Sequence, residues 1–164
     1  MRFEYFQMID RIAALDVGER TVRSVCIVPK ESTIFEGHFP TYPLMPGVLL
    51  LECMAQTCGW LVTAINGFTA MPFLIAAKEA KFRTPVYPGD ALEFDGKMVH
   101  EGSGFAVAAC KGRRQGKAVC EAQITYRVMA FPNPEFRKAL VEWAERIDIQ
   151  VKEFAKETVK EPIK

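Results

Sequence analysis

The segment 36–52 brings together two side chains that could exchange protons with a substrate. His38 is one of only two histidines in the chain and lies in a stretch rich in glycine and proline. Glu52 follows in a strongly apolar run. Burial of a carboxylate is unfavourable and would favour its protonated form near neutral pH. A histidine base and a protonated carboxylate that meet over one substrate can carry out general acid–base catalysis.

Two further residues belong with this pair. Gln56 follows Glu52 by one helical turn, so on a helix both side chains project from one face. A helix that begins at Gly47 leaves its first amides unpaired, at the end where the helix dipole is positive. A carbonyl oxygen placed on these amides would be polarised. Base, acid and oxyanion donor would then lie around one end of one helix.

Each of these residues also has a purely structural interpretation. Glu52 could be bonded to a loop amide or to a partner subunit, because structural networks also perturb carboxylates. A lone loop histidine such as His38 is often only a hydrogen-bonding group. We assign no role to His100, and the glycines at 102 and 104 lack the third glycine and the following helix of a phosphate-binding loop. Only the combination of residues favours chemistry.

The run 47–66 predicts the helix that carries Glu52. It is almost wholly apolar and does not alternate with period two, which favours a helix buried nearly all round. Pro46 suits its start, and Asn66 with Gly67 suits its end. A membrane span is the alternative, because the run is close to membrane length. Polar residues within the run and the lack of basic anchors beside it argue against a span.

Strand-forming runs separated by turn signals follow and precede this helix. We expect strands at residues 21–28, 71–83, 91–100, 105–111 and 118–129, the last two forming a hairpin around the polar turn 113–116. The Pro- and Gly-rich residues 29–46 are expected to form a loop. One long buried helix among several antiparallel strands indicates an α+β fold in which a sheet wraps a central helix.

Pro132 and Pro134 mark a boundary near the C-terminus. We therefore expect one domain at residues 1–131 and a C-terminal helical extension at 132–164. Apolar residues within 136–147 have the spacing of an amphipathic helix. Lysine and glutamate alternate over 152–164, a charge ladder typical of a solvated or frayed helix.

Composition narrows the class of protein. The 164 residues carry a formal net charge of +1, which gives no global electrostatic basis for binding nucleic acid or a membrane. The chain has five cysteines, an odd number, and opens without a signal-peptide pattern. We therefore expect a cytoplasmic protein whose cysteines act as small hydrophobic residues. Cys53 and Cys58 lack zinc-ligand spacing, so we expect no metal site.

Two motifs carry a family resemblance. The run 37–56 resembles the active-site segment of 3-hydroxyacyl-acyl-carrier-protein dehydratases of the FabZ type; it reads Gly-His-Phe-Pro-Thr-Tyr-Pro-Leu-Met-Pro-Gly-Val-Leu-Leu-Leu-Glu-Cys-Met-Ala-Gln. The run 81–90, Lys-Phe-Arg-Thr-Pro-Val-Tyr-Pro-Gly-Asp, is similar to a second signature of that family. The resemblance extends loosely from about residue 9 to residue 129. It implies a hot-dog fold, a curved antiparallel sheet wrapped around a long central helix.

The resemblance also implies roles for the residues singled out above. His38 would be the catalytic base and Glu52 its acid partner. The Gly47 amide would donate to the thioester carbonyl, and Gln56 would orient its neighbours. The site would form in a homodimer, with His38 of one chain facing Glu52 of the other, and trimers of dimers are also usual in the family. Glutamate at position 52, where related dehydratase–isomerases tend to carry aspartate, favours plain dehydration.

The resemblance implies no cofactor and an acidic acyl carrier protein as partner. A basic rim for that carrier could be formed by Lys81, Arg83, Lys111, Arg113, Arg114 and Lys117, or these could be ordinary solvated charges. Candidates for lining the acyl channel are Phe39, Leu44, Met45, Val48 and Phe82, with core packing as the alternative for each.

Two other functions stay open at this point. In a hot-dog acyl thioesterase, Glu52 would activate water against the carbonyl, which leaves His38 unexplained. A non-enzymatic module that binds acyl carriers or lipids has no need for both His38 and Glu52. The sequence does not fix the acyl chain length, because tunnel depth depends on side-chain packing and on the partner subunit.

Overall fold

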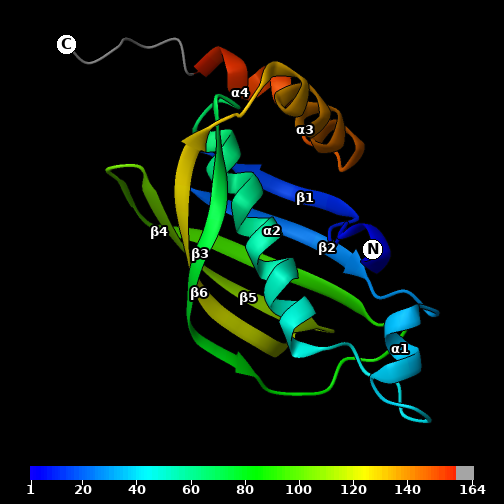
Figure 1. The fold of residues 1–164 in the computed structure, drawn as a ribbon. Coiled ribbons are helices and arrows are strands. Elements are labelled where there is room, and N and C mark those ends of the chain that lie inside the picture. Colours follow the sequence, from blue (N-terminus) through cyan, green and yellow to red (C-terminus); the bar gives the residue numbers. More distant parts are fainter. Residues whose placement is uncertain (158–164) are drawn as a thin grey trace.

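The computed structural model describes residues 1–157, with side chains described as far as Phe154. A short 3-10 turn, η1, spans Phe3–Tyr5. The strands are β1 Arg11–Asp16, β2 Thr21–Ile27, β3 Ala70–Phe82, β4 Ala91–Gly102, β5 Phe105–Arg114 and β6 Lys117–Ala130. The helices are α1 Thr33–Gly37, α2 Gly47–Ile65, α3 Pro134–Arg146 and α4 Val151–Glu157. Figure 1 shows their arrangement.

The strands form one antiparallel sheet in the order β1-β2-β4-β5-β6-β3. Buried and exposed residues alternate along β2, β4, β5 and β6, because successive side chains of a strand point to opposite faces. The buried face packs on α2, around which the sheet curves (Figure 1). This is the hot-dog fold, so the predicted α+β class is confirmed.

Helix α2 begins and ends where the sequence predicts. Pro46 precedes its first turn, and Asn66 and Gly67 donate backbone amides to its last carbonyls. The helix is long and apolar enough to cross a membrane by length and composition. Its most apolar window is 61% buried inside the fold, which is the behaviour of a core helix.

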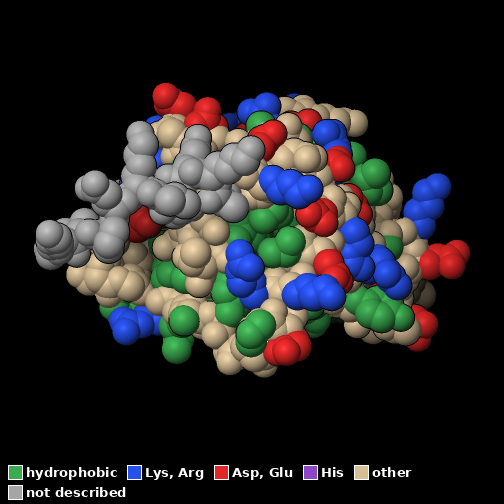
Figure 2. All heavy atoms as spheres, turned by 90° about the horizontal axis from the view of Figure 1, so that it is seen from above, with side chains coloured by type: hydrophobic (Ala, Val, Ile, Leu, Met, Phe, Trp, Pro, Cys, Tyr) green, Lys and Arg blue, Asp and Glu red, His purple; other side chains and the backbone are tan. Residues whose placement is uncertain are grey.

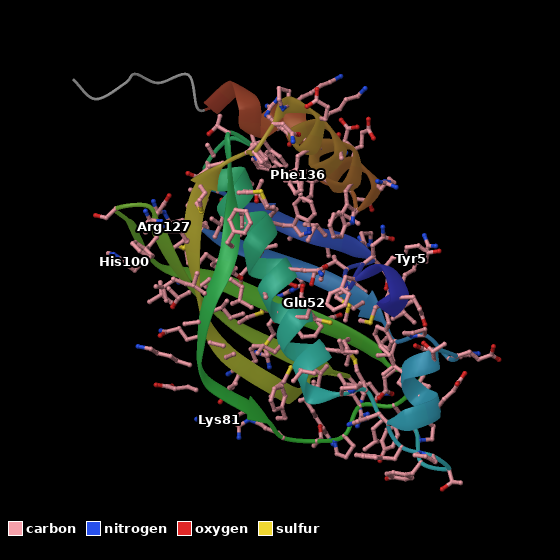
Figure 3. The ribbon with its side chains drawn as sticks, in the orientation of Figure 1. Tyr5, Glu52, Lys81, His100, Arg127 and Phe136 are labelled. Carbon is pink, nitrogen blue, oxygen red and sulfur yellow. The ribbon has the colours of Figure 1, made fainter. Side chains whose placement is uncertain are left out.

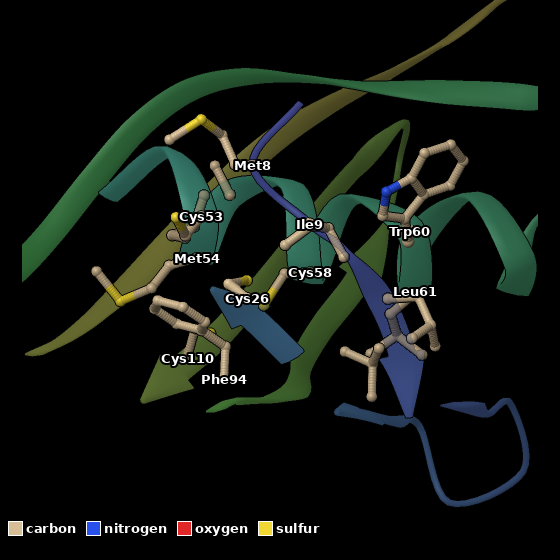
Figure 4. Close-up of a cluster of buried hydrophobic side chains, with 14 of the residues drawn as sticks. Met8, Ile9, Cys26, Cys53, Met54, Cys58, Trp60, Leu61, Phe94 and Cys110 are labelled. Carbon is tan, nitrogen blue, oxygen red and sulfur yellow. The ribbon is translucent and has the colours of Figure 1, made fainter. Parts of the chain in front are cut away.

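Sulfur-containing and aromatic side chains fill the space between α2 and the sheet (Figure 4). All five cysteines are free and buried there. Burial raises the pKa of the Cys120 thiol to about 12, so this thiol stays protonated at neutral pH. The buried hydroxyls of Ser24 and Thr57 bond each other at 2.7 Å, which satisfies both inside the apolar layer.

Two glycines of the sheet, Gly96 and Gly112, lie in close contact with side chains of the core. A Cβ atom on Gly112 of β5 would lie 2.5 Å from the Cys120 sulfur and 2.7 Å from the Phe94 ring. A Cβ atom on Gly96 of β4 would lie 2.8 Å from the Cys58 sulfur on α2. The core at these points therefore has no room for a methyl group.

Gly112→Ala is expected to lower the free energy of unfolding by about 1–3 kcal/mol, because overpacking displaces the neighbouring side chains. Urea denaturation followed by circular dichroism measures this change. Gly18→Ala is the control, because a Cβ there meets its nearest neighbour at an ordinary 3.4 Å. Equal stabilities of the two variants would contradict the tight packing.

Two local predictions need correction. The expected loop 29–46 contains the short helix α1, because Ser32 caps it by accepting a hydrogen bond from the Ile34 amide. The hairpin turn is shorter than 113–116, since β5 continues to Arg114 and β6 begins at Lys117. Gln115 and Gly116, with φ of 51° and 76°, form a two-residue turn that keeps the strands paired up to its edge.

The C-terminal helices pack on the rest of the fold. Asn133 caps α3 by accepting from the Phe136 amide, and the Ile147 carbonyl accepts from the Ile12 amide of β1. Ala144 and Ile149 are buried in the common core. Phe136, expected on the apolar face, is instead 42% exposed.

The helical prediction holds for α3 and α4, whereas residues 158–164 of the charge ladder lie outside the described part of the chain. The division of the chain at residue 131 stays a prediction. On the face that carries α3 and α4, basic and acidic side chains are interspersed (Figure 2).

Candidate active site

His38 is held at the end of α1 by its own loop. Its backbone amide donates to the Ile34 carbonyl, and its carbonyl accepts from the Leu44 amide. The ring nitrogen Nδ1 lies 3.1 Å from the Leu44 carbonyl oxygen. A carbonyl can only accept, so this contact places the ring proton on Nδ1. The lone pair of the neutral ring is then on Nε2, where a base needs it.

The His38 loop meets the start of α2 around a shared pocket. Met45 donates its amide to the Val86 carbonyl at 2.8 Å, which ties the loop to the segment after β3. His38, Met45, Gly47 and Phe82 line this pocket together with Leu44, Leu50, Arg83, Thr84, Pro85 and Val86. A Cβ atom on Gly47 would touch the Phe82 ring at 3.3 Å. The Gly47 amide, at the first position of α2, has no acceptor within the helix.

Glu52 and Gln56 form a second group on α2. The Gln56 side-chain nitrogen donates to Glu52 Oε1 at 2.9 Å and to the Phe6 carbonyl at 2.7 Å. The Gln56 oxygen accepts from the Met8 amide at 3.1 Å. Gln56 thus fixes both the Glu52 carboxylate and the N-terminal segment. Glu52 is only half-buried in the chain, unlike the burial its apolar neighbours predict.

The two groups lie on different sides of α2. Glu52 lines a hollow with Trp60 and Trp143, and His38 lines the separate pocket at Gly47. Gly47 and Glu52 are five helical positions apart, which rotates their directions by about 140°. Figure 3 shows Glu52 in the middle of α2. A single chain therefore does not bring His38 and Glu52 together.

The structure divides the five predicted channel residues. Leu44, Met45 and Phe82 line the His38 pocket. Phe39 stacks on the His38 ring, with centroids 4.1 Å apart, and lines a different hollow. Val48 is 71% exposed on the first turn of α2. Phe39 and Val48 therefore do not line this pocket within one chain, and their place in an acyl channel stays a prediction.

Most of the predicted basic rim is paired with carboxylates. Glu121 on the outer face of β6 lies within 4 Å of three basic side chains, those of Lys81, Arg83 and Lys111. The Arg83 contact lowers the pKa of Glu121. Arg113 pairs with Asp95, and Arg114 pairs with Asp90. Lys81 lies at the lower end of β3 in Figure 3, whereas His100 extends from the far end of β4.

The N-terminal segment was not part of the predicted site. The backbone groups of Phe6 and Met8 bond to Gln56, which in turn bonds to Glu52, and backbone groups leave no signal in a sequence. No group of three or more potential metal-ligating side chains is found among the described residues.

Gln56→Leu is expected to lower the free energy of unfolding by about 1–3 kcal/mol, because it leaves the partners at Phe6 and Met8 unsatisfied. Urea denaturation measures this effect. Gln123→Leu, on the outer face of β6, is the matched control. An equal effect of both substitutions would show that the hydrogen bonds of Gln56 to Phe6 and Met8 do not contribute to stability.

The curved antiparallel sheet around α2 places this chain in a structural class, the hot-dog proteins. A FabA-like domain model matches residues 2–123. The chain belongs to this FabA-like family. It is 38% identical over 126 residues to the 3-hydroxyacyl-[acyl-carrier-protein] dehydratase FabZ of Bartonella quintana, covering 76% of this chain and 81% of that protein. The Bartonella henselae FabZ gives the same identity and coverage.

Solved structures share the fold at low sequence identity. A hypothetical thioesterase from Streptococcus pneumoniae, solved with coenzyme A, superposes with a TM-score of 0.59 at 18% identity. The match covers 75% of this chain and 88% of the thioesterase. Such a likeness supports the hot-dog architecture alone.

Proposed function

We propose that this protein is a 3-hydroxyacyl-[acyl-carrier-protein] dehydratase of fatty acid biosynthesis. It converts a (3R)-3-hydroxyacyl thioester reversibly to the trans-2-enoyl thioester and water. The observation that carries the proposal is the state of His38: its Nδ1 is bound to the Leu44 carbonyl, which leaves Nε2 as the ring nitrogen that can act as a base, and His38 lines the pocket that begins at Gly47. The two Bartonella relatives at 38% identity supply the substrate class.

The proposed mechanism uses three groups of the protein. Nε2 of His38 removes a proton from C2, which the thioester acidifies. The Gly47 amide, assisted by the α2 dipole, stabilises the negative charge that develops on the thioester oxygen. Glu52 gives its proton to the hydroxyl on C3, directly or through water, as the C3–O bond breaks. Water leaves, and the C2–C3 double bond forms. No cofactor is required by this sequence of steps.

The mechanism requires two chains. His38 and Glu52 line separate pockets of one chain, so we propose that His38 of one subunit faces Glu52 of another. Coverage by the second subunit would exclude water from the half-buried Glu52. In this arrangement Gln56 orients the Glu52 carboxylate through their 2.9 Å hydrogen bond.

Strand β3 offers the surface for this dimer. It lies at one edge of the sheet with β6 as its single neighbour, and its residues Phe73, Leu74 and Ile75 are all more than 40% exposed. A long, apolar edge strand is a surface that pairs readily with another strand. We propose an antiparallel homodimer through β3; three such dimers could assemble further.

The acyl carrier protein is proposed to bind beside the His38 pocket. Arg83 lines that pocket, and Lys81 and Lys111 approach the same carboxylate, Glu121. Five of the six predicted basic residues share three carboxylates, and we propose that their excess of positive charge attracts an acidic carrier. Salt should therefore weaken carrier binding.

The decisive experiment gives the protein one substrate and measures the products of the two candidate reactions, hydration and thioester hydrolysis. Purified protein is incubated with crotonyl and longer enoyl thioesters of acyl carrier protein, while enoyl absorbance and free thiol are recorded. The proposal predicts loss of enoyl absorbance through hydration, without thiol release. Thiol release without hydration would indicate a thioesterase. Tight carrier binding without either product would indicate a non-enzymatic carrier-binding module.

A further inference from the structure

The hollow beside Glu52 continues along one stripe of α2. Its helical lining comes from positions three or four residues apart, namely Glu52, Ala55, Gln56, Gly59, Trp60 and Thr63. This stripe extends about 16 Å along the helix axis. Met71, Pro72 and Leu74 of β3 and Tyr126 of β6 form the opposite side. The hollow thus begins at the proposed acid and leads away from it.

The interior of this hollow is apolar beyond Glu52 and Gln56. The Tyr126 hydroxyl donates to the Ala55 carbonyl at 2.7 Å, and the Thr63 hydroxyl donates to the Gly59 carbonyl at 2.9 Å. The polar groups at the far end are therefore satisfied within the protein. The volume is about 190 Å³, comparable with the ~150 Å³ apolar cavity that holds benzene in another protein. A hydrocarbon tail suits this chemistry.

Helix α3 closes the far end. Leu140 and Trp143 line the hollow, and the Trp143 ring packs edge-on against Trp60 with centroids 5.4 Å apart. Both residues lie beyond residue 123, the last position that the FabA-like domain model matches. This wall is thus supplied by the C-terminal segment, outside the matched region.

Several contacts hold α3, which supplies this wall, against the rest of the fold. Arg137 donates from Nε to the Phe68 carbonyl at 2.7 Å, which ties α3 to the turn after α2. Ala144 of α3 and Ile147, the residue after the end of α3, are 0% and 4% exposed. Together with the Asn133 cap, these contacts fix the position of Leu140 and Trp143. A fixed wall limits what the hollow can contain.

We propose that Leu140 and Trp143 of α3 form the end wall of the acyl-tail pocket and thereby determine the chain length that this protein accepts. This inference rests on the proposed function for its substrate class, because the tail is that of the acyl thioester processed at Glu52. A tail that passes Glu52 lies along the α2 stripe and ends against the two tryptophans.

Two variants change the pocket in opposite directions. Trp143→Ala removes part of the wall. Gly59→Leu fills the hollow from α2, where a Cβ atom meets its nearest neighbour, Pro72, at an acceptable 3.6 Å. Glu142→Ala is the control, because Glu142 is the exposed neighbour of Trp143 on the same helix. The variable measured is the ratio of kcat/KM for hydration of dodecenoyl over crotonyl carrier thioesters.

Gly59→Leu is expected to lower this ratio by at least about tenfold, because each methylene kept out of an apolar site weakens binding about fourfold. Trp143→Ala is expected to shift the preferred chain length upward, and Glu142→Ala to leave the profile as in the wild type. An unchanged ratio in Gly59→Leu would overturn the proposal even if Trp143→Ala does not fold.

A second measurement is independent of catalysis. The chain contains only two tryptophans, and both line this pocket. An acyl carrier thioester with a brominated chain end should therefore quench the intrinsic fluorescence of the wild type, and quench Gly59→Leu much less. Absent quenching with normal hydration would overturn the tail pocket alone. Quenching without hydration would support the pocket and contradict the proposed dehydratase reaction.

Discussion

His38→Ala is expected to reduce enoyl thioester hydration by about 10²–10⁴-fold while leaving the fold intact, because the variant lacks the proposed base for the C2 proton. The fold should tolerate the change, since within residues 1–157 the His38 ring makes one hydrogen bond, to the Leu44 carbonyl, and stacks on the exposed Phe39. Steady-state hydration assays and circular dichroism check both parts of this prediction.

His100→Ala is the matched control for this variant. His100 is the second of two histidines in the chain and extends from the exposed end of β4. We expect the activity of the control to stay within about twofold of the wild type, as for surface substitutions away from special features. Full activity of His38→Ala, or an equal loss in both variants, would contradict the role of His38.

Glu52→Gln is expected to cause a loss of similar size, about 10²–10⁴-fold, because an amide can neither take a proton from the attacking water in hydration nor return it in dehydration, the role proposed for Glu52. The amide has nearly the same shape and can keep the hydrogen bond with Gln56, so the free energy of unfolding should change little. Hydration kinetics and urea denaturation of the same preparation separate the two effects.

Glu142→Gln is the control for the loss of a carboxylate, since Glu142 is an exposed residue of α3 that does not line the hollow beside Glu52. If Glu52→Gln retained wild-type rates, the proton donor would have to be another group. If it instead lost stability, Glu52 would be a structural carboxylate, which was the alternative at the level of the sequence.

The sequence predicts the elements of this fold better than their contacts. Helix α2 is recognisable because Pro46 and Asn66 bound a long apolar run. Five of the six strands are recognisable as strand-forming runs between turn signals, whereas β1 was not predicted. The short helix α1 was missed, since its formation depends on a local cap by Ser32 within a Pro-rich stretch. Exposure of Val48 also could not be predicted, because apolar composition does not show which side of a helix end is covered.

The candidate site is predictable in its residues and only partly in its geometry. The spacing of Glu52 and Gln56 correctly predicts that they contact each other on one face of α2. The contacts of residues 6–8 with Gln56 could not be predicted, because they join backbone groups to a distant part of the chain. The same holds for Leu140 and Trp143, since no local sequence pattern indicates that α3 lines the hollow beside Glu52. The separation of His38 from Glu52 follows from the helix rotation between Gly47 and Glu52, and it is the reason for proposing a second subunit at the site.

The most direct test of this account is to mix the two inactive variants, His38→Ala and Glu52→Gln, after dissociating and reassociating their subunits. Random association makes half of the dimers mixed, and each mixed dimer has one site with both groups intact and one with neither. Hydration activity should then return to about a quarter of the wild-type value, one half of one half. Activity that stays at the level of the separate variants would contradict a site shared between His38 of one chain and Glu52 of the other.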